Sequence, residues 1–250
     1  MRPDQPPTPD RSEIGDTDVD PVLRAVYSGG PGGSELELGW RAREIEQEIP
    51  ELRLVVAQVV VGRSGSVIAG STPGIEDRLR ELSNRFRGAR AVTVRRELVP
   101  AAYRVFFRHI GLDPDVVRTP IEAAALERML RGGFLSGGLL EDILLIALVD
   151  TSVPVWALDS EAVDGPLGIR SSTEGESLGR SSGAPLLPAG RLVVADASAA
   201  LAPLFGELAP GHEAGADTRR LTLFAIQIAG VPSLYVEEAL WTCCTALEQP

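Results

Sequence analysis

Two side chains of opposite charge, Arg118 and Asp142, are the first candidates for chemistry in this sequence. Arg118 directly precedes a predicted helix start, and its planar guanidinium could hold a carboxylate or a phosphate through two parallel hydrogen bonds. Asp142 lies in an otherwise apolar helical stretch, where it could bind a substrate amine or orient a water molecule. Both residues also have a structural interpretation, because buried acids are usually paired. Arg118 could form an ion pair with Asp142 or with Asp115.

Three further residues, Glu122, Asp159 and Tyr103, complete the candidate ligand-binding set. Glu122 is the third residue of a helix that has Thr119 as its predicted N-cap, so a capping box accounts for it more simply than general-base catalysis does. Asp159 ends a predicted strand, and ligands bind at strand ends in open α/β sheets. A turn-capping aspartate is the alternative for Asp159. Tyr103 lies on the aromatic face of the helix predicted over 98–110.

The sequence carries no motif for a metal or a cofactor. It has two histidines, His109 and His212, and neither a CxxC nor an HExxH pattern, which excludes the common zinc sites. Cys243 and Cys244 are adjacent, so they cannot join distant segments and are expected to be small core residues of an apolar helix. We therefore expect no metal and no cofactor.

The charge is acidic overall and unevenly distributed. All 24 basic residues are arginine, and the net charge of −11 argues against tight, non-specific binding to nucleic acid. Residues 78–131 nevertheless carry 12 arginines against 6 acids. This excess predicts either solvated helix faces with ion pairs such as Glu81–Arg85 and Glu127–Arg131, or a face that binds an anionic ligand.

The chain divides into a tail and a domain. Residues 1–20 contain four prolines and six acids, and residues 29–33 read Gly-Gly-Pro-Gly-Gly. We therefore expect residues 1–34 to form a disordered acidic tail with a linker, and residues 35–250 to form a single domain. No run of 18 apolar residues is present, and the first 20 residues lack the apolar segment of a secretory signal, so a cytoplasmic location without membrane contact is expected.

Periodicity predicts an α/β (α+β) fold with a mixed central sheet flanked by helices. Leu52–Val61 is almost continuously apolar and β-branched, which is typical of a strand buried on both faces and predicts helices on both sides of the sheet. Residues 171–190 are predicted to form an exposed loop, whose Glu174 and Glu176 could close over a ligand. The predicted strands are 35–40, 52–61, 153–158, 165–170, 191–195 and 219–229, and the predicted helices are 41–49, 72–87, 98–110, 119–131, 138–149, 197–206 and 233–247.

A series of short motifs follows a recognisable order along the chain. The motifs are Tyr103-Arg104, Gly111-Leu112-Asp113-Pro114, Arg118, Thr119 to Ala123, Leu140-Glu141-Asp142, Pro154 to Asp159, Gly165 to Arg170, Gly175-Glu176 and Gly190 to Asp196. Their order and spacing resemble the B3/B4 domain of the phenylalanyl-tRNA synthetase beta subunit, and more closely the free-standing bacterial proteins built on that domain. The similarity covers roughly residues 36–245.

The resemblance implies a B3/B4-like fold and a ligand pocket. In the synthetase this domain removes tyrosine wrongly attached to phenylalanine tRNA, and free-standing relatives are described as tRNA- or nucleic-acid-binding-like. Two features depart from the family pattern. Leu145 and Leu148 stand where the family carries Asn and Ser, and the segment 204–207 lacks the family's Arg and Trp. Because an editing pocket must hydrogen-bond an ester and position a water molecule, the resemblance implies the fold more strongly than the editing reaction.

Three functions remain open on this evidence. The first is a binding protein for tRNA or for an aminoacyl or amino-acid-like small molecule, in which the editing chemistry is degenerate. The second is a trans-editing hydrolase that deacylates mischarged tRNA. The third is a protein–protein adaptor that keeps only the fold.

Overall fold

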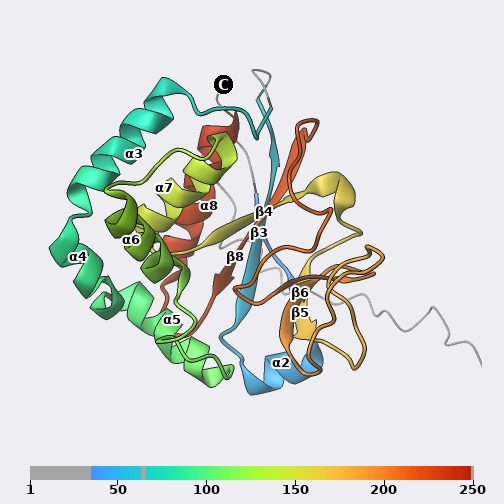
Figure 1. Cartoon of the computed structure of the whole chain (residues 1–250). Helices are drawn as coiled ribbons and strands as arrows, with labels where there is room; N and C mark the ends of the chain where they lie inside the picture. The colour runs from blue at the N-terminus through green and yellow to red at the C-terminus, as the bar shows by residue number, and fades with distance from the viewer. Residues whose placement is uncertain (1–34, 63–65, 249–250) are drawn as a thin grey trace, which may run out of the picture.

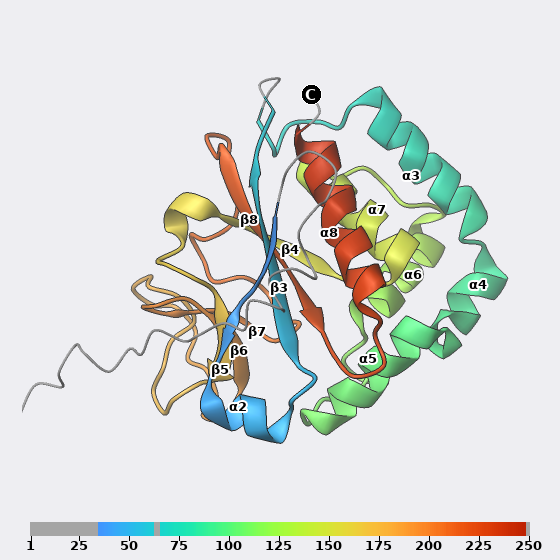
Figure 2. The same ribbon diagram turned by 180° about the vertical axis from the view of Figure 1, so that it is seen from behind.

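The computed structural model describes residues 35–62 and 66–248, so the tail expected over residues 1–34 lies outside the described residues. Two four-stranded sheets pack face to face, and a thick layer of helices covers the other side of the larger sheet (Figure 1). The reverse view shows the same layers, with β5, β6 and β7 on one side of β3 and β8 and with α7 and α8 on the other (Figure 2). The predicted α/β class is confirmed.

The larger sheet, called sheet A, is antiparallel throughout. Its strands are ordered β1 (Leu36–Leu38), β3 (Arg53–Val60), β8 (Arg220–Gln227) and β4 (Val155–Asp159). The two central strands pair over eight residues, and the predicted apolar strands at 52–61 and 219–229 are confirmed as β3 and β8. Strands β1 and β4 form the two edges of sheet A.

The second sheet, called sheet B, contains the mixed pairing. Its strands are ordered β2 (Trp40–Arg41), β5 (Gly168–Ser171), β6 (Leu192–Ala195) and β7 (Ala200–Pro203). Strand β2 runs parallel to β5, and the other neighbours are antiparallel. Sheet B covers the face of sheet A that is turned away from α7 and α8, so the expectation of helices on both faces is wrong. A continuous apolar run shows that a strand is buried on both sides, but it does not show what buries it.

Gly39 allows the chain to pass from one sheet to the other. It separates β1 from β2, and its amide N–H donates to the Leu54 carbonyl at 2.9 Å. A Cβ atom at this position would lie 2.7 Å from the Leu167 carbonyl oxygen and 2.9 Å from the Leu54 side chain. Any side chain would therefore push the two sheets apart at this corner.

The helix predicted over 197–206 is wrong, because this segment forms β7. Alanine-rich composition favours a helix, but the Asp196 carboxylate accepts hydrogen bonds from the amides of Ser198 and Ala199 and closes a tight turn there. The chain then returns antiparallel to β6, with a register shift between Val194 and Ala195. Tertiary pairing therefore overrides local propensity.

The helices form two layers on sheet A. The inner layer is α7 (Leu139–Thr151) and α8 (Ser233–Glu248), which contact each other. Helix α8 contacts the central strands β3 and β8, and α7 contacts the edge strand β4. The outer layer is α3 (Pro73–Arg85), α4 (Gly88–Thr93), η2 (Val94–Arg96), α5 (Leu98–His109) and α6 (Pro120–Arg131). Two short elements, α2 (Arg43–Glu48) and η3 (Ser160–Ala162), lie beside the sheets.

Helix α7 is apolar on nearly every side because it lies between two cores. Ile143 and Ala147 belong to the main core shared with sheet A, whereas Ile146 and Val149 belong to a second core formed with α3, α4 and α6. A helix that is apolar all round is expected to be buried. Cys243 and Cys244 on α8 are buried core residues, as predicted, and burial raises the pKa of Cys243. Among the described residues, no helix is both long and apolar enough to cross a membrane.

Tyr103 fastens α5 to the end of sheet A. The side chain is 1% exposed, and its hydroxyl donates to the Ile226 carbonyl at 2.8 Å. Burial strongly raises the pKa of Tyr103, so the hydroxyl stays protonated and remains a donor. The aromatic face predicted for this helix is therefore a core face, and Tyr103 holds the fold together.

We expect the substitution Tyr103→Phe to lower the free energy of unfolding by about 1–2 kcal/mol, because it leaves the buried Ile226 carbonyl without its partner. Chemical denaturation of both proteins measures this difference. Tyr235→Phe is the matched control, since the Tyr235 side chain is on the surface and its loss of a hydroxyl should cost little. Equal stability of the two variants would contradict the assignment.

The predicted loop 171–190 is tied to sheet B by an ion pair. Both guanidinium nitrogens of Arg170 on β5 donate to the Glu176 carboxylate, one of them at 2.9 Å. The Arg170 hydrogen bond, opposed by partial desolvation, lowers the pKa of Glu176. Glu176 therefore anchors its loop, and Glu174 stays exposed.

The anchor should give stability a defined pH dependence. A lowered pKa means that the unfolded chain binds the proton more readily, so the stabilisation is complete above the ordinary glutamate pKa of about 4.3 and is lost as the pH falls through the lower folded value. We expect Glu176→Gln to lower stability by about 1–2 kcal/mol at pH 7 and by progressively less below about pH 4. Denaturation at several pH values, with Glu174→Gln as control, measures this; a constant difference down to pH 2.5 would be the contrary result.

Candidate functional site

Asp142 is the buried centre of a small polar cluster at the start of α7. Its carboxylate accepts hydrogen bonds from the hydroxyls of Ser71 and Ser136 and from the Gly137 amide, the last at 2.9 Å. Asp142 is only 1% exposed. The proposed ion pair with Arg118 is not formed. Asp142 instead ties the loop before α3 and the loop before α7 to the helix.

Glu122 forms the predicted capping box. Its carboxylate accepts from the Thr119 hydroxyl at 2.7 Å and from the Thr119 amide at 3.4 Å. Arg104 also donates to Glu122, at 2.7 Å, and a second nitrogen of Arg104 contacts Asp115. These contacts occupy Glu122 fully, so its geometry favours the structural interpretation.

Arg118 is exposed and does not pair with either predicted partner. Asp115 pairs with Arg104 and Arg108, and the Arg104 hydrogen bond lowers the pKa of Asp115. Among the described residues, Arg118 is in no ion pair. It lines a cavity of 230 Å³ together with Arg95 and Glu122.

The other arginines of residues 78–131 are mostly neutralised by acids. Both predicted pairs on helix faces are formed, Glu81–Arg85 at 3.6 Å and Glu127–Arg131 at 3.0 Å. Asp150 on α7 accepts from two arginines of α3, Arg78 at 2.8 Å and Arg85 at 3.1 Å. Pairing of this kind supports solvated, internally balanced helix faces more than an anion-binding face.

Asp159 caps the turn after β4. Its carboxylate accepts from the Thr218 hydroxyl at 2.6 Å and from the Glu161 amide at 3.0 Å. The five candidate residues therefore do not meet in one pocket. Arg118 and Glu122 line one cavity, Asp142 lines another of 170 Å³, Tyr103 lies in the core, and Asp159 holds a turn. Their roles in ligand binding stay predictions.

A cavity of 300 Å³ opens at the outer edge of β4, and we call it the edge pocket. Its walls come from the loop before α3, the start of α7, β4 and the loop 208–214. The lining residues are Val67, Ile68, Gly137, Gly138, Leu140, Glu141, Leu144, Val155, Trp156, Ala157, Leu208, Glu213 and Ala214. Gly137 and Glu141 also line the neighbouring cavity that contains Asp142. Asp142 therefore positions one wall of the edge pocket through its hydrogen bond to Gly137.

The backbone of β4 presents an N–H donor to the edge pocket. At the end of this strand, the Asp159 amide donates outward to the His212 carbonyl at 2.9 Å. Because peptide groups alternate in direction along a strand, the N–H and C=O of Ala157, two residues earlier, point to the same outer side. No strand of sheet A lies beyond β4 on that side. An antiparallel bridge between Leu158 and Glu213 pairs this outer side with the loop 208–214. In such a bridge the Ala157 C=O faces the Ala214 N–H, so the Ala157 N–H is the backbone group left for a ligand.

Trp156 is held rigidly at the pocket wall. Its ring stacks on Phe224 of β8, with centroids 5.3 Å apart and planes 7° apart, and meets Phe205 edge-on. Its indole N–H donates to the Gly206 carbonyl at 3.2 Å. The segment 204–207, which departs from the family pattern, thus supports Trp156 from behind. Such locked aromatic walls cost little entropy on binding.

The charged side chains of the edge pocket are both acids. Glu141 is exposed at the start of α7, and Glu213 lies in the opposite loop, where its carboxylate accepts from the Gly211 amide at 2.8 Å. The lining residues include no arginine. The pocket therefore attracts a cationic group and offers the Ala157 backbone for a neighbouring polar group.

Leu145 and Leu148 do not line the edge pocket. Both are packed against the second core, on the side of α7 that meets α3 and α6. Their apolar character therefore fits the helix layer and does not affect the polar groups of the edge pocket. Sequence reasoning missed Trp156, Ala157 and Glu213, although Trp156 and Ala157 lie in the motif Pro154 to Asp159 that ends in a candidate residue.

Comparison with known proteins identifies a distant relationship. No family model matches the chain. A stretch of 101 residues is 37% identical to the phenylalanine–tRNA ligase beta subunit of Xanthomonas axonopodis pv. citri and of two strains of Xanthomonas oryzae pv. oryzae. The match covers 39% of this chain and 12% of each relative, so the chain corresponds to a small part of those subunits. The chain is therefore distantly related to the phenylalanine–tRNA ligase beta subunit.

We expect Asp142→Asn to lower the free energy of unfolding by about 2–3 kcal/mol, because it removes the charge that accepts three buried hydrogen bonds. Local opening should concentrate in residues 132–138, and hydrogen exchange of the Gly137 amide measures it. Glu141→Gln is the control on the same turn of α7, since this exposed side chain should leave stability within about 0.5 kcal/mol. Unchanged exchange at Gly137 in the Asn variant would argue against the positioning role.

Proposed function

We propose that the protein binds the aminoacyl end of a tRNA and that the edge pocket holds the amino acid. The observation that carries this proposal is the presence of two carboxylates, Glu141 and Glu213, and of the outward-facing Ala157 N–H around one small cavity. The distant relationship to a ligase subunit whose name specifies phenylalanine and tRNA supports the choice of ligand class. The order of motifs that resembles the B3/B4 domain supports it further.

The pocket chemistry matches an α-amino acid ester. Such a group carries an ammonium ion next to a carbonyl, and charge-assisted hydrogen bonds from the ammonium to carboxylates are among the strongest polar contacts. In this arrangement Glu141 and Glu213 would receive the ammonium, and the Ala157 N–H would donate to the ester carbonyl. Trp156 would contact the apolar side chain of the amino acid.

The tRNA body should contribute less to the binding free energy than the aminoacyl end does. The chain carries a net charge of −11, and most arginines of residues 78–131 are paired with acids. Few phosphates can then be neutralised, so the salt dependence of binding should be shallow. General nucleic-acid binding would instead give an affinity that falls steeply as the salt concentration rises.

The test compares three forms of phenylalanine tRNA: aminoacylated, N-acetyl-aminoacylated and uncharged. We expect the aminoacylated form to bind about tenfold more tightly than the other two, because a charged hydrogen bond contributes about 1.5 kcal/mol or more and the acetyl group removes the charge. Filter binding or fluorescence anisotropy at constant salt measures the three affinities. Equal affinities for all three forms would overturn the proposal.

A pair of variants locates the recognition site. The double variant Glu141→Gln with Glu213→Gln should lose the tenfold preference, whereas Glu161→Gln, which changes an acid just after β4 outside the pocket lining, should keep it. The same reactions report hydrolysis. Release of the amino acid at a rate that depends on Glu141 or Glu213 would show that the trans-editing function is retained, and stable complexes would support binding alone.

A further inference from the structure

A second and larger cavity lies on the outer side of α8. Its volume is 820 Å³, within the range of small-molecule sites. Four parts of the fold enclose it: the end of β3, the residues around Ser66–Thr72, the start of α3, and one side of α8. It shares no lining residue with the edge pocket. We call it the α8 cavity.

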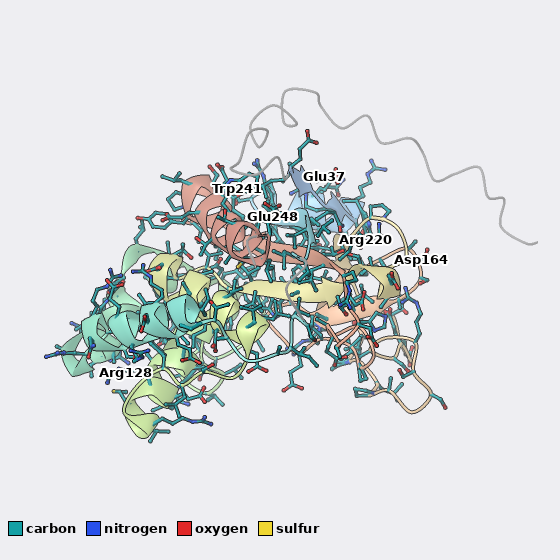
Figure 3. All side chains as sticks on the ribbon, turned by 90° about the horizontal axis from the view of Figure 1, so that it is seen from above. Glu37, Arg128, Asp164, Arg220, Trp241 and Glu248 are labelled. Carbon is teal, nitrogen blue, oxygen red and sulfur yellow. The ribbon has the colours of Figure 1, made fainter. Side chains whose placement is uncertain are left out.

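Helix α8 has apolar side chains on two sides, one fully buried in the core and one only partly covered by it. Val236, Leu240 and Cys243 are fully buried against sheet A. The opposite side carries Leu234, which is 67% exposed, and the half-buried Trp241. Figure 3 shows Trp241 on α8, at the edge of the helix layer. Large apolar side chains left exposed around a cavity mark a binding site more often than they serve the fold.

The polar groups at the α8 cavity have no partner among the described residues. Glu237 precedes Trp241 by one turn of α8, so the two side chains lie on the same side of the helix. Within the part of the chain that the structure describes, neither Glu237 nor Glu238 forms an ion pair, and the Trp241 indole N–H has no hydrogen-bond acceptor. Several acids elsewhere on the helices are paired with arginine, as Glu81, Glu122 and Asp150 are.

The shape and charge of the α8 cavity together define a ligand class. An apolar body would fill the space between Ile75, Leu139 and Trp241, and a positive group would reach the carboxylates of Glu237 and Glu238. A cation beside an indole ring gains a further attraction to the face of the ring. We propose that the α8 cavity binds a small organic amine with an aliphatic or aromatic body.

The start of α3 favours an anionic ligand in the α8 cavity. Thr72 and Gly74, at the start of α3, also line it, and Thr72 makes no side-chain capping hydrogen bond. The amide N–H groups of a helix start attract anions, but this attraction corresponds to about half a charge. Two full carboxylates on α8 outweigh it. An amine is therefore favoured over a carboxylate of the same size, and a molecule with both groups is the intermediate case.

The test uses hexylamine, hexanoate and 6-aminohexanoate, which share one chain length and differ in charge. Titration calorimetry and Trp241 fluorescence on the full chain measure their affinities. We expect hexylamine to bind at least about tenfold more tightly than hexanoate, as one charged hydrogen bond predicts. Hexanoate binding as tightly as hexylamine, or no binding of hexylamine at 10 mM (about 3 kcal/mol of binding free energy), would overturn the proposal.

Variants separate this cavity from the edge pocket. Glu237→Gln with Glu238→Gln should weaken hexylamine binding about tenfold and leave binding of neutral hexanol unchanged. Glu141→Gln with Glu213→Gln should leave hexylamine binding at the α8 cavity unchanged, while it removes the preference for aminoacylated tRNA. Trp241→Leu should abolish the fluorescence response. Hexylamine binding that is lost with the edge-pocket pair and kept with the α8 pair would place the amine site elsewhere and refute the inference.

Discussion

Burial of the β3–β8 pair on both faces is the constraint on which the rest of the structure depends. These two strands share an eight-residue antiparallel register, and most of their side chains are buried. A strand pair of this kind requires a cover on each face, because exposed apolar surface costs about 25 cal/mol per Å². Helices α7 and α8 provide one cover, and sheet B provides the other. The edges of sheet A are left over, and the candidate pocket forms at one of them.

Local sequence signals predicted most of the elements but not the layer they belong to. The capping box at Thr119 and the apolar runs of β3 and β8 gave correct helix and strand positions, since each depends on neighbours a few residues away. The second cover of sheet A and strand β7 depend on pairing between distant segments. Residues 200–203 have helical composition, and only their partner β6 makes them a strand.

Local sequence signals also fail to predict which side chains of the candidate site serve a ligand and which serve the fold. Residue type suggested that Asp142, Glu122 and Asp159 could serve a ligand, but each carboxylate is taken up by hydrogen bonds of the fold. Acids are the usual caps of turns and helix starts, so type alone cannot separate the two uses. The edge pocket depends instead on a property that no residue letter carries, namely the position of β4 at the edge of sheet A, where only part of its outer side is paired with a loop.

The first turn of α7 places two neighbouring leucines in two different cavities. Leu139 lines the α8 cavity, and Leu140 lines the edge pocket. A shift of this turn would therefore move a wall of each cavity. Thermodynamic linkage then requires reciprocity, so any factor by which an amine changes the affinity for an aminoacyl group equals the factor by which the aminoacyl group changes the affinity for the amine. The helix is thus a physical route for cooperativity between two ligands that never touch.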